Sequence, residues 1–417
     1  MTQDADTARS NAVKGGSAIA VAIGIMNVAT YVFTILSARL MGPQPFGAFT
    51  ALMNVLLVAG VLALALQATA ARRIAREPGD VHEVEQQILA VGRRASIGLG
   101  LFFLLISPLV NIALRLHSLP TAALLAVAVA PTTLMGAQAG VLQGERRWLP
   151  LALVYIAAGV PRLVLGVGLL SWKHNEAVAI LAVTIGAFVP VLVAAIALRA
   201  PRSDHTHASG EHTARSVWWE TVYNSQALLA FLVLSSIDII IARNALSDHD
   251  AGLYAAGLIM VKAVMFLPQF VVVLAFPSMG TDHARRSALL ASLVLVALTG
   301  VAVVIGVKVL PSLALRFVGG AKYDAIGDHL WVFAVLGTVL SMIQLLVYSV
   351  LARQARNSVV VLWVSLVPLI ALGRLASSVD QLVARVLTVD SVLLVILLAI
   401  SLWRLGRDEA AERAQSA

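Results

Sequence analysis

Long apolar runs recur along the 417-residue chain, and they limit its possible folds more than any other feature. Charged residues make up only 12% of the sequence and gather in short clusters between these runs. A helix of roughly twenty apolar residues crosses a hydrocarbon core of about 30 Å. Because backbone polar groups in lipid must be satisfied internally, only helices or closed barrels can cross, and these runs are too long for barrel strands. The sequence therefore predicts an all-α polytopic membrane protein.

We expect twelve transmembrane helices. Prolines lie inside several of them, and these prolines predict kinks, because neighbouring helices in a membrane can satisfy the carbonyl groups that a proline frees. The expected spans cover approximately residues 15–37, 46–69, 95–114, 120–142, 149–171, 177–198, 219–241, 252–279, 286–310, 328–351, 358–376 and 385–403.

The turn after the first span is repeated about two hundred residues later, and this repeat indicates a tandem duplication. Residues 37–54 find their counterpart in residues 241–260. In both copies a helix ends in Ala-Arg, a short polar break follows, and the next helix opens with Gly-x-aromatic. A second motif, the Val-Leu pair that ends at Leu142, is repeated in the same order by the Val-Leu pair that ends at Leu351. The matching positions are Ala38-Arg39 with Ala242-Arg243, and Gly47-Ala48-Phe49 with Gly252-Leu253-Tyr254.

A polar stretch, residues 199–216, divides the chain into lobes of six spans each, residues 1–198 and 217–417. Because six is even, both lobes enter the membrane from the same face, so their pseudo-twofold axis runs along the membrane normal. Three histidines in the stretch, His205, His207 and His212, could suggest a metal site. Their Ser, Thr and Gly neighbours are more typical of a solvated tether, so we expect no metal.

The distribution of positive charge predicts the orientation. Most of the 30 Lys and Arg residues fall on the side that holds both termini, which makes that side cytoplasmic and the duplicated turns outward-facing. The formal net charge of +8 thus follows from topology, and no nucleic-acid partner is expected. The polar first residues precede a long apolar run with no small-residue cleavage site, which predicts a retained signal anchor.

Three ionisable residues lie well inside expected spans, where a charge is costly unless it faces a cavity or a counter-charge. By helical rise, Arg162 and Lys262 lie about 18 Å and 15 Å from the starts of their spans, near the midplane and one in each lobe. Asp238 is the acid that we identify inside a span. It could neutralise Lys262, reach Arg243, or form a proton or sodium site.

Polar residues form stripes along three spans, the third of which starts at the charged Lys262 and includes Phe266. Such stripes can line a polar path or hydrogen-bond neighbouring helices, and the pattern leaves both open. The stripes comprise Asn27, Thr30 and Thr34; Thr50 and Asn54; and Lys262, Phe266 and Gln269.

The chain resembles bacterial polysaccharide-biosynthesis flippases, which belong to the superfamily of multidrug, oligosaccharidyl-lipid and polysaccharide exporters. The resemblance rests on Ala-Arg-Leu-Met-Gly-Pro at 38–43, Pro-Phe-Gly-Ala-Phe at 45–49, Ala-Arg-Arg-Ile-Ala at 71–75, Ile-Asp at 237–238 and Ala-Gly-Leu-Tyr-Ala-Ala at 251–256. It implies a two-lobed bundle around a central V-shaped cavity lined by the first, second, seventh and eighth spans. It also implies alternating access that moves a polyprenyl-pyrophosphate-linked oligosaccharide across a bacterial cytoplasmic membrane.

Such a substrate has an apolar tail, an anionic pyrophosphate and a polar sugar, and a flippase must give the last two a polar path. We expect Arg162 and Lys262 to bind this substrate, together with Asn27, Asn54 and Gln269. The paired Arg39 and Arg243 at the outward turns are candidates for an outer gate, with ordinary interfacial arginines as the simpler interpretation.

Two other functions stay open. A cation-coupled multidrug antiporter needs a carboxylate in its cavity, but the first span has no acid and only Asp238 remains. A membrane glycan-assembly enzyme or scaffold would need an outer carboxylate cluster or a His and Ser constellation, which the sequence does not offer. We therefore expect no catalytic residues and no cofactor. The expected partners are the lipid-linked oligosaccharide, membrane lipids, and a polysaccharide polymerase or glycosyltransferases.

Overall fold

The structure is a computed structural model that describes residues 2–76, 81–199, 214–266, 284–352 and 356–416. Within these ranges every regular element is a helix, as the apolar runs predict. The first half contains α1 (Thr2–Met41), α2 (Pro43–Ala59), α3 (Val61–Arg76), α4 (Val81–Leu105), α5 (Ser107–Ala113), α6 (Leu119–Gly144), α7 (Trp148–Trp172) and α8 (Glu176–Leu198). The second half contains α9 (Ala214–Ala245), α10 (Asp248–Met265), α12 (Ala284–Val309), α13 (Pro311–Val318), the 3-10 helix η2 (Ala321–His329), α14 (Leu330–Ala352), α15 (Arg356–Gly373) and α16 (Val379–Ser416).

Ten helical segments of the described chain are long and apolar enough to cross a membrane. The multi-pass helical fold is thereby confirmed. The two further expected spans fall on α10, which carries Asp248, Asp250 and Lys262, and on α15, whose apolar part Val359–Gly373 is shorter. The count of twelve stays a prediction.

The chain forms two compact units by its internal packing. Unit 1 comprises Met1–Met41 and Val55–Gln226, and unit 2 comprises Gly42–Asn54 and Ala227–Ala417. The first part of α2 therefore packs with the second half of the chain. The lobes expected at residues 1–198 and 217–417 describe the duplication and stay a prediction, and most of the stretch 199–216 lies outside the described residues.

In unit 1, α6 packs against α3, α4, α7 and α8, while α1 packs against α7. Three glycines of α6, one per turn, let α3 approach closely. A Cβ at Gly136 would overlap the carbonyl group of Ala63, one at Gly140 would lie 2.6 Å from the carbonyl oxygen of Gln67, and one at Gly144 would lie 2.7 Å from Cβ of Ile74. This spacing of small residues is a usual device of helix packing in membranes.

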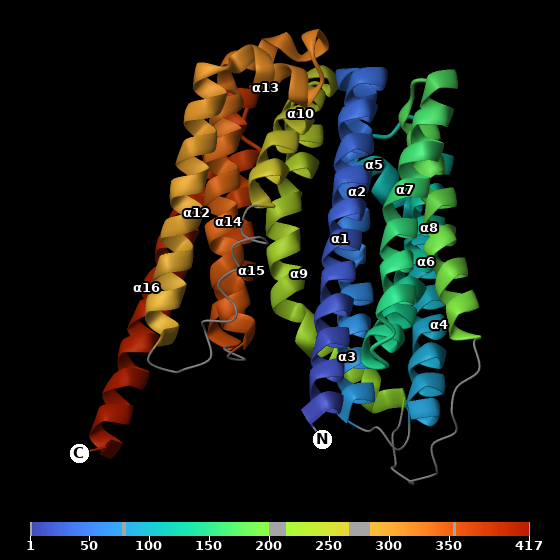
Figure 1. The fold of residues 1–417 in the computed structure, drawn as a ribbon. Coiled ribbons are helices and arrows are strands. Elements are labelled where there is room, and N and C mark those ends of the chain that lie inside the picture. Colours follow the sequence, from blue (N-terminus) through green and yellow to red (C-terminus); the bar gives the residue numbers. More distant parts are fainter. Residues whose placement is uncertain (1, 77–80, 200–213, 267–283, 353–355, 417) are drawn as a thin grey trace. The chain divides into compact units, whose positions relative to one another are not determined.

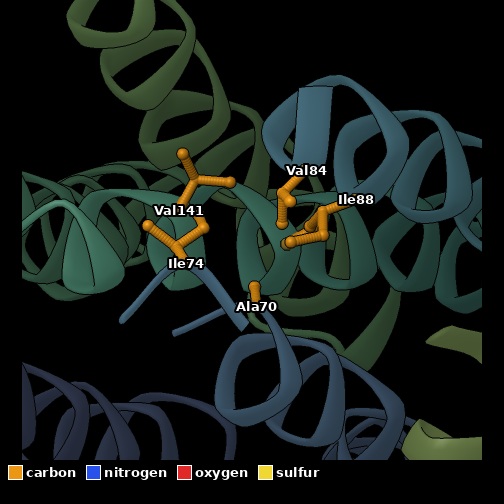
Figure 2. Packing of buried hydrophobic residues seen from close by; sticks show 6 residues of the cluster. Ala70, Ile74, Val84, Ile88 and Val141 are labelled. Carbon is orange, nitrogen blue, oxygen red and sulfur yellow. The ribbon is translucent and has the colours of Figure 1, made fainter. Parts of the chain in front are cut away.

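Beside this seam, apolar side chains of α3, α4 and α6 pack together in a buried core. Figure 2 shows Ala70 and Ile74 of α3, Val84 and Ile88 of α4, and Val141 of α6 in contact. A second core joins α6, α7 and α8. Unit 1 is thus held by cores on both sides of α6, with these helices running side by side in Figure 1.

In unit 2, α14 packs against α10, α12 and α16, and α15 packs against α16. The two duplicated helix starts meet each other in this unit. A Cβ at Gly47 would lie 3.0 Å from Cα of Gly252, and a Cβ at Gly252 would overlap the carbonyl group of Pro43. The ring of Phe46 packs edge-on against Tyr323 at 6.2 Å between centroids.

Corresponding histidine–carboxylate pairs stand at the same place in each half. His117, just before α6, lies 3.8 Å from Glu176 at the start of α8. His329, just before α14, lies 3.6 Å from Asp380 at the start of α16. Because α6 and α14 end in the echoed Val-Leu pairs, these contacts are a structural trace of the duplication that the sequence predicts.

Candidate functional site

The candidate site in unit 2 centres on Asp238 of α9, whose side chain is 2% exposed. Its Oδ2 accepts a hydrogen bond of 2.9 Å from the hydroxyl of Tyr254, and its Oδ1 accepts one of 2.8 Å from the backbone N–H of Ile239. Tyr254 is itself fully buried, with its ring edge-on to Phe333 at 5.4 Å. The carboxylate is therefore held by α10 as well as by its own helix.

Lys262 of α10 lies near this carboxylate and interacts with it electrostatically. Its ammonium group donates a hydrogen bond of 3.1 Å to Oδ1 of Asn54, and Asn54 donates one of 2.8 Å to the carbonyl of Thr50. Two residues that the sequence singles out separately, Lys262 and Asn54, are thus brought into direct contact. Of the two partners expected for Asp238, Lys262 interacts with it electrostatically, and Arg243 forms an ion pair with Asp248.

Asp390 of α16 belongs to the same cluster, and the sequence reasoning missed it. The statement that Asp238 is the acid within a span is wrong, because Asp390 is 1% exposed and interacts electrostatically with Asp238. Its Oδ1 has no hydrogen-bond partner among the described residues. The available signal was a lone Asp inside the apolar run of the expected span 385–403.

Arg162 of α7 is the basic residue inside unit 1. A Cβ at Gly186 of α8 would lie 3.1 Å from Cα of Arg162, so the two helices are in close contact at this residue. The Arg162 side chain is half-buried, and its Nε has no hydrogen-bond partner within the described residues. The N–H group at Nε of Arg162 is therefore a hydrogen-bond donor that no described protein group accepts.

The paired arginines at the outward turns differ from each other. Arg243 is fully buried and forms an ion pair of 2.9 Å with Asp248, in the first turn of α10. This contact joins the end of α9 to the start of α10, where Ser247 caps the helix by accepting a hydrogen bond from the backbone N–H of Asp250. Arg39 is exposed in the last turn of α1. A role of either residue as an outer gate stays a prediction.

The remaining predicted substrate residues divide as follows. Asn27 is half-buried on α1, whereas Gln269 lies outside the described residues. In the ranges that the structure describes there is no group of three or more His, Asp or Glu side chains that could hold a metal ion, and the three histidines of residues 199–216 lie outside those ranges.

A second polar cluster, in unit 1, was not foreseen. Gln67 of α3 donates hydrogen bonds to Oε1 of Gln143 on α6 at 2.9 Å and to the hydroxyl oxygen of Tyr155 on α7 at 2.7 Å. All three side chains are half-buried. The sequence could have indicated them only as isolated polar residues, since they lie on three different helices.

Comparison with known families gives a match over most of the chain. The family model described as polysaccharide biosynthesis protein matches residues 12–281. No curated protein sequence matches the chain.

Solved structures of the same fold cover nearly the whole chain. An inward-facing multidrug resistance MATE family transporter of the MOP superfamily aligns with a TM-score of 0.74 at 14% identity, over 95% of this chain and 96% of that one. The lipid II flippase MurJ, in an inward closed conformation, aligns with a TM-score of 0.72 at 11% identity, over 91% and 87%. An outward-facing MATE family transporter aligns with a TM-score of 0.61 at 13% identity, over 94% and 96%. At these identities the likeness establishes a shared fold.

Proposed function

We propose that this chain, which belongs to the family of polysaccharide biosynthesis proteins and shares its fold with transporters of the MOP superfamily, is a membrane transporter that flips a polyprenyl-pyrophosphate-linked oligosaccharide by alternating access. The transport would take place across the bacterial cytoplasmic membrane, with both chain termini in the cytoplasm. It would supply cell-surface polysaccharide synthesis, working beside a polymerase or glycosyltransferases.

The observation that carries this proposal is that each unit has a basic residue far along one of its helices, Arg162 in unit 1 and Lys262 in unit 2. Arg162 and Lys262 each follow the first residue of their helix by fourteen positions, which places them about 21 Å along α7 and α10. A cation at such depth is costly in lipid and usually faces a polar cavity or a counter-charge. The pyrophosphate of the substrate is an anion that both could bind in turn.

Lys262 and Arg162 have different surroundings, which suit different steps in binding the pyrophosphate. Lys262 is held by the neutral oxygen of Asn54 and balanced by Asp238, so its position is fixed while its charge is shared. Arg162 leaves Nε without a hydrogen-bond partner among the described residues. An anion that bound Arg162 would complete its hydrogen bonding, and anions hydrogen-bonded to a guanidinium group form strong contacts.

We further propose that Asp238 and Asp390 couple transport to an ion gradient. Asp238 interacts electrostatically with both Lys262 and Asp390, and one ammonium group cannot balance two carboxylates. The second negative charge therefore needs a bound proton or a cation. Asp238→Asn keeps the shape and an acceptor for Tyr254 but removes the charge. We expect this variant to be present at normal level and to lose glycan display; normal display would assign Asp238 a purely structural role.

A cation-coupled multidrug antiporter is the second candidate. Asp390 favours it, because it supplies the additional buried carboxylate that such an antiporter would use. The two candidates separate by substrate. Drug resistance that depends on Asp238 and Asp390, with normal glycan display in cells that lack the protein, would support the antiporter over the flippase.

The primary experiment measures glycan display in cells whose chromosomal copy is deleted and replaced by variants. Arg162→Ala and Lys262→Ala should each reduce display by about tenfold or more, since a hydrogen bond to a charged group is worth about 1.5–3 kcal/mol. Lys308→Ala is the matched control, because Lys308 is an exposed lysine near the end of α12 that lies over the ring of Trp331. Normal glycan display in both test variants would show that Arg162 and Lys262 are not needed for transport.

A further inference from the structure

The cluster of Gln67, Gln143 and Tyr155 has the chemistry of a binding site that the flippase proposal does not yet use. It joins three helices of unit 1 through two hydrogen bonds, both donated by the side-chain amide of Gln67. Each side chain is half-buried, so part of each remains accessible. The two internal bonds use only part of the hydrogen-bonding capacity of these side chains.

A side-chain amide has two donors and one carbonyl acceptor, and a phenol has one donor with additional acceptor capacity. Both N–H groups of Gln67 are used inside the cluster. Within the described residues, no further bond occupies the carbonyl oxygen of Gln67, the amide N–H groups of Gln143 or the hydroxyl hydrogen of Tyr155. The cluster thus presents an acceptor and several donors side by side, without any net charge.

The surroundings hold these atoms in place. The backbone of Gln67 lies directly against Gly140, where a Cβ would come within 2.6 Å of the Gln67 carbonyl oxygen. Tyr155 packs at the edge of the core formed by Leu142, Leu151 and Val154. A site whose groups are fixed before the ligand arrives loses less conformational entropy on binding.

The position of the cluster indicates which environment it faces. Tyr155 follows the first residue of α7 by seven positions, which is about 10 Å along the helix. At this depth an accessible group of polar side chains is unfavourable against lipid and is expected at a hydrated surface. The nearby helix ends carry Arg72, Arg73, Arg146 and Arg147, on the side that the charge distribution assigns to the cytoplasm.

We propose that Gln67, Gln143 and Tyr155 form a saccharide subsite that binds hydroxyl groups of the glycan when the lipid-linked oligosaccharide enters from the cytoplasmic side. Vicinal sugar hydroxyls each donate and accept, and a planar amide beside a second amide and a phenol offers the complementary pairs. Because the three side chains carry no charge, we expect them to bind the sugar of the substrate rather than its anionic pyrophosphate. This inference rests on the proposed function and deepens it by naming residues that select the glycan.

The test compares two lipids on the purified full chain in lipid nanodiscs. The probes are polyprenyl pyrophosphate without sugar and the lipid-linked oligosaccharide pool extracted from cells that lack this protein. Gln67→Leu removes the centre of the cluster, Tyr155→Phe removes one hydroxyl, and Gln86→Leu changes an exposed glutamine of α4 as the control.

We expect Gln67→Leu to raise the Kd for the glycan-bearing lipid by about five- to tenfold and Tyr155→Phe by about threefold. The Kd for the sugar-free lipid should be unchanged in both, and Gln86→Leu should match wild type with each lipid. An equal loss for both lipids, or no change for either, would overturn the subsite while the flippase proposal stands. Failure of the wild-type protein to bind either lipid would instead overturn the proposed function and the subsite with it.

Discussion

The α1–α2 and α9–α10 hairpins share a sequence pattern, yet among the side chains whose burial the structure describes, only α9–α10 contributes charged groups that are buried. Asp238 corresponds to Thr34 in the register of the echoed Ala-Arg pairs, and Tyr254 corresponds to Phe49 in the register of the echoed Gly-x-aromatic motifs. Asp238 accepts a hydrogen bond from Tyr254 across the hairpin. Thr34 donates to the carbonyl of Thr30 in its own helix, at 2.9 Å.

The same contrast holds for the paired arginines, since Arg243 is buried in an ion pair with Asp248 whereas Arg39 is exposed. What the two hairpins share is the glycine at each second-helix start, Gly47 and Gly252, where the helices meet. The two helix starts thus keep the glycines at which they touch each other, whereas the buried ion pair and the buried carboxylate lie in the second hairpin. The first half carries its polar chemistry elsewhere, in Arg162 and in the Gln67 cluster.

The largest expected effect tests the shared feature. Gly252→Leu should destabilise the protein by about 3 kcal/mol, because its side chain would overlap the carbonyl of Pro43 and overpacking costs about 1–3 kcal/mol or more. Gly306→Leu is the control, since a Cβ at that position meets no atom within 4 Å. The measurement is the apparent melting temperature in detergent. Equal melting temperatures for the two variants would show that the helices do not meet at these glycines.

The next effect tests the difference between the arginines. Arg243→Ala should cost about 2 kcal/mol, because it removes a fully buried guanidinium and leaves Asp248, which is 34% exposed, without this partner. Arg39→Ala should change stability by less than about 0.5 kcal/mol, as is usual for exposed positions. The measurement is the apparent melting temperature of each single variant. A loss of similar size in both would contradict the proposed difference between the two arginines.

A smaller effect is expected when a residue of the α9–α10 hairpin is replaced by the type found at the matching position of the α1–α2 hairpin. Tyr254→Phe makes the second copy resemble Phe49 and removes only the hydroxyl that donates to Asp238, so we expect a loss of about 1–2 kcal/mol. Combined with Asp238→Ala, which removes the acceptor, the loss should be less than the sum of the two single losses, because both variants remove the same hydrogen bond. Strict additivity in a double-mutant cycle would mean that the bond contributes nothing.

The smallest effect concerns a contact that the two halves keep alike. His117→Gln and His329→Gln should each lower stability by less than about 0.5 kcal/mol, because these pairs with Glu176 and Asp380 are partly exposed and separated by 3.6–3.8 Å. Unfolding in urea at neutral pH can compare both variants with wild type. A large loss in only one of them would reveal a further asymmetry.

Much of this architecture follows from local sequence pattern. Apolar runs determine the helices, and the echoed motif locates both hairpins, because each signal is carried by neighbouring residues. The positions of Lys262 and Asn54 within expected spans identified each of them as a candidate. Their hydrogen bond could not be predicted, because it depends on how α2 and α10 pack against each other.

Long-range packing accounts for what the sequence did not predict. Asp390 becomes important through its proximity to Asp238 on a different helix, which no spacing rule reveals. Likewise, the grouping of residues 42–54 with unit 2 depends on the glycine contact rather than on chain order. The Gln67 cluster unites three helices whose polar residues look unrelated in sequence.

The most direct test of the flippase proposal is transfer of the extracted lipid-linked oligosaccharide across the bilayer of sealed proteoliposomes that contain the purified protein. Newly exposed glycan can be measured by cleavage with an external glycosidase. We predict that wild-type protein and Lys308→Ala accelerate transfer, whereas Arg162→Ala and Lys262→Ala slow it by about tenfold or more. Transfer no faster than in protein-free liposomes, by wild-type protein with or without an imposed proton or sodium gradient, would contradict the account.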